Sequence, residues 1–370
     1  MAIGSFKLPN TAAVTPVAPD AWTRPSDWLA MPTIGTQEFI GLLAITDDES
    51  NHIALLCRGA YTVDWGDGVT ENVADNVKAQ HTYTYSAISS GTLSTRGYKQ
   101  VLVRVTPQAG QNLTTVTIQQ QNSILGKFHT VSWLDIAING SNITTLGLGG
   151  STIVRISMCE RVTIGVLGSI TNLSSIFNGF HSLQSIPLFN TAAVTNMQNM
   201  FKECYSLRTV PLFNTIAVTT FQTMFDSCRA LQTVPLFNMA AAITLTGMFQ
   251  YCNSLQTIPL FNTATVTAFS SVFLDCNSLQ TLPNLNTAAG TSFTSMMQAN
   301  ISLAKGAFQG TRYAISYAGF CLSQSAIVDI FNGLGTAVGT PTINVSSNPG
   351  RAALTAGEIL IATSKGWIVV

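Results

Sequence analysis

Charged residues are scarce in this sequence, and they form no runs of one sign. The 370 residues include seventeen basic and seventeen acidic side chains, so 9% of the chain is charged, whereas globular proteins usually carry about 25%. No four consecutive residues are all Lys or Arg. This balance argues against binding nucleic acid or a membrane surface through charge. The surface must therefore be built largely from Thr, Ser, Asn and Gln.

Long apolar runs are also missing. The longest nearly apolar stretch, Phe39–Ile45, is far shorter than the roughly 20 residues of a membrane-spanning helix. The N-terminal stretch up to Trp22 has one Lys, three prolines and no apolar centre of the kind that secretory signals have. We therefore expect the protein to be made in a cytoplasm, and to stay there or leave by a route without a signal peptide.

Known catalytic and metal-binding motifs are absent from the sequence. Seven Cys occur without any Cys-x-x-Cys pair, and the four His are scattered, which argues against a zinc site or a disulfide framework. No G-x-S-x-G, H-E-x-x-H or phosphate-binding loop is present. We therefore expect no enzyme activity, no catalytic residues, no metal and no cofactor.

The middle of the chain repeats with a period of 24 residues, which is typical of a solenoid. Pro187 and Asn190 each begin a column that recurs at this spacing. The columns that we assign to the core comprise Phe201, Phe225, Phe249 and Phe273, then Cys204, Cys228, Cys252 and Cys276, and a leucine column that includes Leu207. We interpret the Cys column as buried, reduced thiols.

Each coil has a strand-like half and a helix-like half. Leu183, Ile186 and Leu188 have the Leu-x-x-Leu-x-Leu spacing of a short strand whose side chains face a stacked core. Residues 194–204 have apolar side chains at intervals of three and four, which predicts a short helix with Thr195 as its N-cap. The sequence thus predicts a mixed α/β solenoid of the leucine-rich-repeat type.

The repeat resembles the leucine-rich repeats of bacterial surface proteins of the BspA type, whose consensus reads close to MF-x-x-C-x-SL-x-x-I-P-x-F-N-T. The resemblance runs from about Ile176 to Leu303, with mild departures such as Ala230 and Asn300. It implies a non-enzymatic module, exposed outside a cell or on a virion and used for adhesion or assembly.

Strand-like runs separated by polar turns fill residues 37–110 and predict a small all-β sandwich. Within it, the sequence Trp-Gly-Asp-Gly at 65–68 and His-Thr-Tyr at 81–83 resemble the polycystic-kidney-disease (PKD) type of immunoglobulin-like domain, which implies a spacer or adhesion module. Asp64 and Asp67 could bind Ca²⁺. We favour a tight turn at Asp67-Gly68 against which His81 packs.

The predicted organisation has five parts. These are an extended docking arm at 1–36 with Trp22 and Trp28 as aromatic anchors, the immunoglobulin-like sandwich at 37–110, irregular coils at 111–175, the 24-residue repeats at 176–310, and a capping coil at 311–370.

Three functions remain open at this point. The first is a phage virion protein, either a tail fibre or appendage subunit or a capsid decoration, that contacts other virion proteins through its arm and sandwich. The second is a bacterial cell-surface adhesin, and the third is a glycan depolymerase. A host glycan or protein would bind a column of amides, although a merely solvated column is the simpler interpretation. That column is Gln184, Gln232, Gln256 and Gln280.

Overall fold

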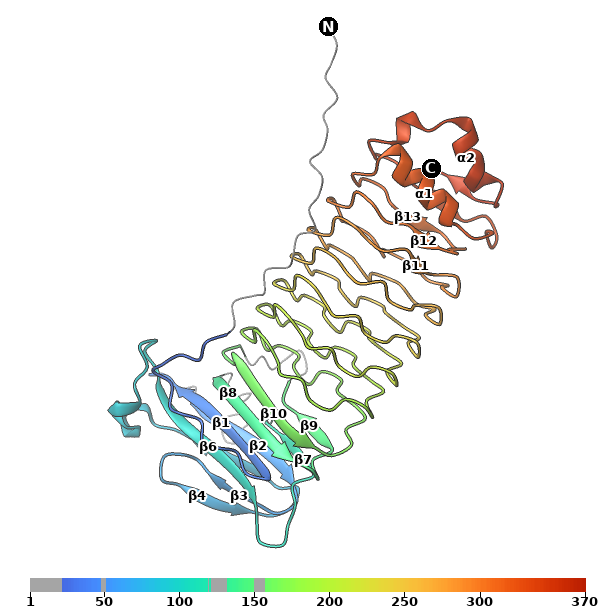
Figure 1. The fold of residues 1–370 in the computed structure, drawn as a ribbon. Helices are drawn as coiled ribbons and strands as arrows, with labels where there is room; N and C mark the ends of the chain where they lie inside the picture. Colours follow the sequence, from blue (N-terminus) through green and yellow to red (C-terminus); the bar gives the residue numbers. More distant parts are fainter. Residues whose placement is uncertain (1–21, 48–50, 119, 121–131, 150–156) are drawn as a thin grey trace.

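The protein is an elongated stack whose two ends differ in structure. The computed structural model describes residues 22–47, 51–118, 120, 132–149 and 157–370. Two β-sheets form one end, open coils form the middle, and two helices lie at the far end (Figure 1). Buried side chains from Phe39 to Trp367 belong to one continuous hydrophobic cluster, so the sheets and the coils share a core.

The N-terminal end consists of a six-stranded and a four-stranded sheet. In spatial order the larger sheet contains β10 (Arg161–Leu167), β8 (Trp133–Gly140), β1 (Gln37–Ile45), β6 (Lys99–Pro107), β3 (Tyr61–Asp64) and β4 (Thr70–Val73). The smaller sheet contains β5 (Lys78–Thr82), β2 (His52–Arg58), β7 (Thr115–Thr117) and β9 (Thr145–Gly147). Short 3₁₀ turns at Tyr85–Ala87 and Ser90–Thr92 precede β6.

The two sheets do not end at residue 110, where the sequence pattern places the boundary of the sandwich. β10 pairs with β8, and β9 pairs with β7, and both of these pairs are parallel. Arg161 in β10 in turn bridges to Ser185 in the first regular coil. Parallel neighbours of this kind are what a coil produces when it returns to the same edge, so the sheets lead directly into the solenoid.

The coils contain no helix at the positions where the sequence predicts one, and this prediction was wrong. Residues 194–204 form turns in which Asn199 and Glu203 have φ angles of 55° and 59°. Residues with positive φ recur at these two positions in the following coils. A left-handed residue every fourth position interrupts an α-helix, so the three- and four-residue spacing reflects successive turns instead. Thr195 is no N-cap, because no helix follows it, and its amide and hydroxyl both donate to Thr171 O of the preceding coil, at 2.9 and 3.3 Å.

Alternate backbone amides in these turns bond in two directions. The amides of Met197, Asn199 and Phe201 donate to carbonyl groups 23 residues later, in the next coil, at 2.8–3.2 Å. The amides between them bond within the same coil, that of Met200 to Met197 O three residues back and that of Gln198 to Asn196 Oδ1. Five consecutive coils repeat this pattern with four inter-coil bonds each, so the stack is a ladder of backbone hydrogen bonds although it holds few regular strands.

The corners of the coils explain the Asn and Thr columns that recur in the repeat. Asn190 Oδ1 accepts the amide of Ala192 at 3.0 Å, which makes a side-chain-closed turn, and the same bond recurs in the following coils. The neighbouring Thr191 is buried and its hydroxyl donates to Asn214 O of the next coil at 2.9 Å. The Asn column therefore shapes each corner, and the Thr column joins it to the next coil except where Met239 replaces the threonine.

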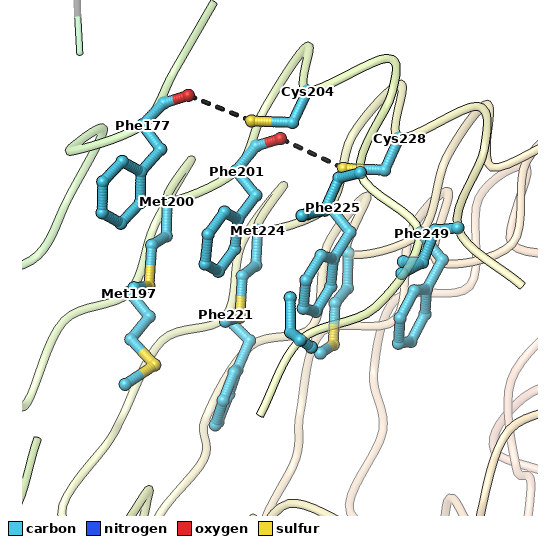
Figure 2. Close-up of a cluster of buried hydrophobic side chains, with 14 of the residues drawn as sticks. Phe177, Met197, Met200, Phe201, Cys204, Phe221, Met224, Phe225, Cys228 and Phe249 are labelled. Carbon is cyan, nitrogen blue, oxygen red and sulfur yellow. Dashed lines mark hydrogen bonds between the residues drawn. The ribbon is translucent and has the colours of Figure 1, made fainter. Parts of the chain in front are cut away.

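Aromatic rings stack along the interior of the ladder (Figure 2). Phe177, Phe201, Phe225, Phe249 and Phe273 lie parallel, with successive centroid distances of 5.4, 5.6, 5.7 and 5.9 Å. All five rings are buried. The assignment of this column to the core is therefore confirmed, as is that of the buried Leu207.

The C-terminal end adds two helices and short parallel pairs. The strands there are β11 (Leu285–Asn286), β12 (Phe308–Gln309), β13 (Ile315–Ser316), β14 (Thr342–Asn344) and β15 (Ile368–Val369). α1 (Gln324–Gly333) begins at Ser323, whose Oγ accepts the amide of Ala326, and α2 (Ala356–Thr363) begins with a capping box between Thr355 and Glu358. A 3₁₀ turn at Arg351–Ala353 precedes α2.

Shortening one ring of the Phe stack should destabilise the protein strongly. We expect Phe225→Ala to lower the free energy of unfolding by about 3–5 kcal/mol, because it removes a buried ring and leaves a cavity between two coils. Urea denaturation followed by circular dichroism measures this change. Leu236→Ala, at a largely exposed side chain, is the matched control and should cost less than about 1 kcal/mol. Equal losses in the two variants would contradict the stacked core.

Candidate functional site

The Gln column lies on the surface of the array. Gln232, Gln256 and Gln280 are exposed and Gln184 is half-buried. Backbone bonds hold the column in register, since Gln256 N donates to Gln232 O at 3.1 Å. Arg208 occupies the same position in the second coil, so the column carries one positive charge that the amide pattern alone does not reveal.

A stripe of exposed leucines runs beside this column, four residues further along each coil. The sequence pattern assigns Leu188 to the core, and that assignment was wrong, because its side chain is 62% exposed. Its counterparts are equally exposed, at 58–60%. We call this set the leucine stripe: Leu188, Leu212, Leu236 and Leu260. Ile186 and Phe189 on either side of Leu188 point inward, so the short strand-like half of the coil presents this one apolar column to solvent.

The leucine stripe is grooved as well as apolar. A shallow depression of about 400 Å³ lies between two of its members, with Phe189 and Asn190 among its lining residues. In the fifth coil Asn284 replaces the leucine, so the stripe ends there. A contiguous apolar surface bordered by amides and hydroxyls is the usual composition of a contact surface for another macromolecule.

The titratable side chains of the array collect at a different position, directly after the Cys column. His181 stacks on Tyr205 at a centroid distance of 4.5 Å, and the Arg229 guanidinium lies 4.6 Å from the other side of that ring system. Two positions before the Cys column, Lys202 Nζ forms an ion pair with the buried Asp226 at 2.9 Å. The 24-residue spacing of His181, Tyr205 and Arg229 signals this stack in the sequence.

The Cys column holds free thiols that bond to the backbone, as expected of a structural column. Cys204 Sγ donates to Phe177 O and Cys228 Sγ to Phe201 O, both at 3.1 Å (Figure 2). Burial raises the pKa of the Cys276 thiol to about 12. In the next coil Asn300 takes the position, and its Nδ2 donates to Phe273 O at 2.6 Å. Asn and Cys are therefore interchangeable here because both can donate to the same carbonyl.

Trp28 is not available to anchor a docking arm. Its ring is 5% exposed and packs against Leu42 and Tyr98, and its Nε1 donates to the Tyr98 hydroxyl at 2.9 Å. Trp22 lies beside it and donates to Glu160 at 3.2 Å. The segment from residue 22 therefore covers the outer face of its own large sheet. The rest of the predicted arm, residues 1–21, lies outside the described residues.

The Trp-Gly-Asp-Gly turn has the structural role that the sequence favours. Gly68 has a φ of 94°, and Asp67 Oδ1 accepts the amide of Val69 at 3.1 Å. His81 Nε2 lies 2.7 Å from Asp67 Oδ2, and the His81 ring stacks on Trp65 at 5.1 Å. Both the carboxylate and the imidazole thus hold the turn against the following strand.

Two further properties concern the described residues alone. Within them, no three His, Cys, Asp or Glu side chains come close enough together to hold a metal ion. None of the helices found there is long and apolar enough to cross a bilayer.

Comparison with known proteins places the repeats in a family context. Residues 166–260 and 244–309 match the family described as "Mycoplasma protein of unknown function, DUF285". No curated protein matches the chain. The family match and the stacked coils are consistent with a repeat protein of the BspA type.

One cysteine should react with thiol reagents much faster than the other six. Cys321 is exposed, whereas the six others are buried. Because the thiolate is the reactive form, the raised pKa and the burial should keep those six silent. We expect one thiol per chain to react rapidly with Ellman's reagent at pH 8 in the native protein, and seven after denaturation. Cys321→Ser should remove the rapid reaction, and a second rapidly reacting thiol would contradict the buried column.

Proposed function

We propose that the protein is a non-enzymatic contact protein exposed on a phage particle, as a tail fibre or appendage subunit or as a capsid decoration. In this proposal the leucine stripe and the Gln column together form the surface that binds a host-surface molecule or another virion protein. The observation that carries the proposal is the continuity of these two columns over successive coils, which creates one surface with an apolar stripe and a row of amides in which Arg208 is the single charged residue.

In this proposal the N-terminal sheets and the coils have different functions. The stacked Trp65 and His81, the Asp67 turn and the two-sheet arrangement support the interpretation of the N-terminal end as a PKD-type spacer module. The coils then serve as leucine-rich-type repeats that present a long face. Residues 1–21, together with the sheets, would dock onto other virion proteins.

A bacterial cell-surface adhesin is the second candidate, and the family match of residues 166–309 favours it, since the resemblance to BspA-type repeats implies surface proteins of bacteria. The same contact surface would serve either role. A glycan depolymerase, the third candidate, would need two carboxylates roughly 5–10 Å apart beside a sugar site.

The location of the protein distinguishes the first two candidates. We expect mass spectrometry of gradient-purified phage particles to detect this chain at a fixed copy number relative to the major capsid protein. The supporting reason is that an exposed virion subunit co-purifies with the particle. Detection in the surface fraction of uninfected cells, with none in particles, would replace the phage proposal by the adhesin.

Binding through the Gln column predicts a loss of attachment without a loss of stability. We expect the quadruple variant Gln184→Ala, Gln232→Ala, Gln256→Ala and Gln280→Ala to lose at least tenfold in adsorption of the purified protein to host cells. Its melting temperature should stay within about 2 °C of the parent, because three of the four side chains are exposed and the fourth is half-buried, and single surface substitutions usually change stability by under about 0.5 kcal/mol.

Two further variants complete this binding test. Leu212→Asn with Leu236→Asn changes the leucine stripe to the residue that the fifth coil already carries, and it should reduce adsorption by a similar factor. Gln222→Ala with Gln250→Ala changes the same residue type on the turns of the hydrogen-bond ladder and should leave adsorption unchanged. Full adsorption by both surface variants would refute the contact surface.

A further inference from the structure

Within the described residues, one coil interrupts the hydrogen-bond ladder between coils. Five successive coils donate four amides each to the next coil, ending with Phe269, Ser271, Phe273 and Asp275. The next four in the same columns, within the part of the chain that the structure describes, donate no hydrogen bond. They are Phe293, Ser295, Met297 and Ala299. The ladder resumes one coil later, where Tyr317 N donates to Asn344 O at 2.7 Å and Gly319 N to Ser346 O at 2.9 Å.

A cleft of about 720 Å³ occupies the interruption, between residues 291–299 and residues 313–320. The same two coils remain joined on the opposite side of the stack. There β11 pairs with β12, and Thr287 N donates to Gln309 O at 2.8 Å. The stack is therefore closed along one side and open along the other, and the opening lies at the level of the missing bonds.

The two edges of the cleft have complementary backbone groups. One edge carries the amides of Phe293, Ser295, Met297 and Ala299. On the other edge, among the described residues, the carbonyl groups of Ala314 and Ala318 accept no hydrogen bond. In the regular coils each such amide meets a carbonyl of the next coil directly. Here donors and acceptors face a space instead.

The side chains around the cleft define what could fill it. None of the seventeen lining residues is charged, which disfavours phosphate groups, nucleic acid and acidic ligands. The buried side chains of Phe293, Met296, Ile315 and Phe320 form apolar walls, and Ser292, Thr294 and Ser316 add hydroxyl groups. The volume falls in the range of about 300–1,000 Å³ that is usual for binding pockets.

We propose that this cleft binds an extended, uncharged polypeptide segment of a partner, which inserts as an additional rung of the ladder. The carbonyl groups of the segment accept from the amides of Ser295, Met297 and Ala299, and its own amides donate to Ala314 and Ala318. Alternate side chains of the segment then face the apolar walls, which is how strand addition obtains both affinity and selectivity.

The backbone rows favour a polypeptide over a neutral glycan. A glycan could use the hydroxyl groups and apolar walls, but it has no amide donors at the repeat of a strand for the carbonyl edge. A polypeptide satisfies both edges in the same way in which each coil satisfies its neighbours. This site is separate from the leucine stripe and the Gln column, so it can be tested independently of the proposed function.

A peptide copied from a regular coil provides the probe. The nine residues 243–251 are uncharged, and in the array they both accept from the preceding coil and donate to the next one. We expect this peptide, acetylated and amidated, to bind the full-length protein. Amide hydrogen exchange at Ser295, Met297 and Ala299 should then slow at least tenfold, as followed by NMR.

Two controls test the hydrogen-bond geometry. The same peptide with N-methyl groups at its third, fifth and seventh residues lacks three of the four donors that face the next coil, and we expect its affinity to fall at least tenfold. In the protein, Ala314→Trp should block the cleft and weaken binding equally, whereas Ala264→Trp, at an exposed corner of another coil, should not. Melting curves show whether both variants fold. If Ala314→Trp does not fold, the comparison between the methylated and the unmethylated peptide still tests the proposal.

The outcomes that overturn the proposal are distinct. Absence of peptide binding, or binding that N-methylation does not weaken, would rule out an inserted strand. Binding of a neutral oligosaccharide such as maltoheptaose, with protection at the cleft and no peptide binding, would assign the site to a glycan instead. Slower exchange only at residues outside 291–320 would place the peptide elsewhere and also refute the proposal.

Discussion

Backbone hydrogen bonds between successive coils are the interaction on which the rest of this structure depends. Each coil places two residues at positive φ, a conformation that costs roughly 1–2 kcal/mol for residues other than glycine. This conformation turns alternate amides toward the next coil, and in five successive coils four inter-coil bonds per coil offset its cost. The Phe stack, the Cys column and the buried threonines then fill the interior that the ladder creates. Where the ladder is interrupted, the chain leaves a cleft.

The periodic columns allowed the sequence to predict the core but not the backbone path. The Phe and Cys columns were predicted as buried, and they are, because a residue type that recurs in register must meet itself in the stack. The prediction of a helix at residues 194–204 was wrong. Apolar residues at intervals of three and four also arise from successive turns with left-handed residues, here Asn199 and Glu203. The prediction that Leu188 faces the core was wrong, because a leucine spacing typical of a strand does not show which of the side chains points to solvent.

For the candidate binding surfaces too, some features could be predicted from the sequence and others could not. The exposure of the Gln column could be inferred from its polarity and its period, and so could the tight turn at Asp67. The leucine stripe could not, because its members have the composition of a core column. The burial of Trp28 on its own sheet depends on contacts with Leu42 and Tyr98, which are distant in sequence. The cleft lies where, among the described residues, backbone amides form no hydrogen bond with the next coil, and no residue type in the sequence indicates that these bonds are missing.

Asn300 shows how loosely each position of the array is tied to one residue. It takes over the bond of the cysteines with a different chemical group, so the architecture requires a donor at this point and little else. Because each of the regular coils that the structure describes bonds to its immediate neighbours, a whole unit of 24 residues could be duplicated or deleted in the gene without disturbing the bonding of those that remain. The span of the molecule is then an evolvable quantity, adjustable in fixed increments, independent of the chemistry presented at either end.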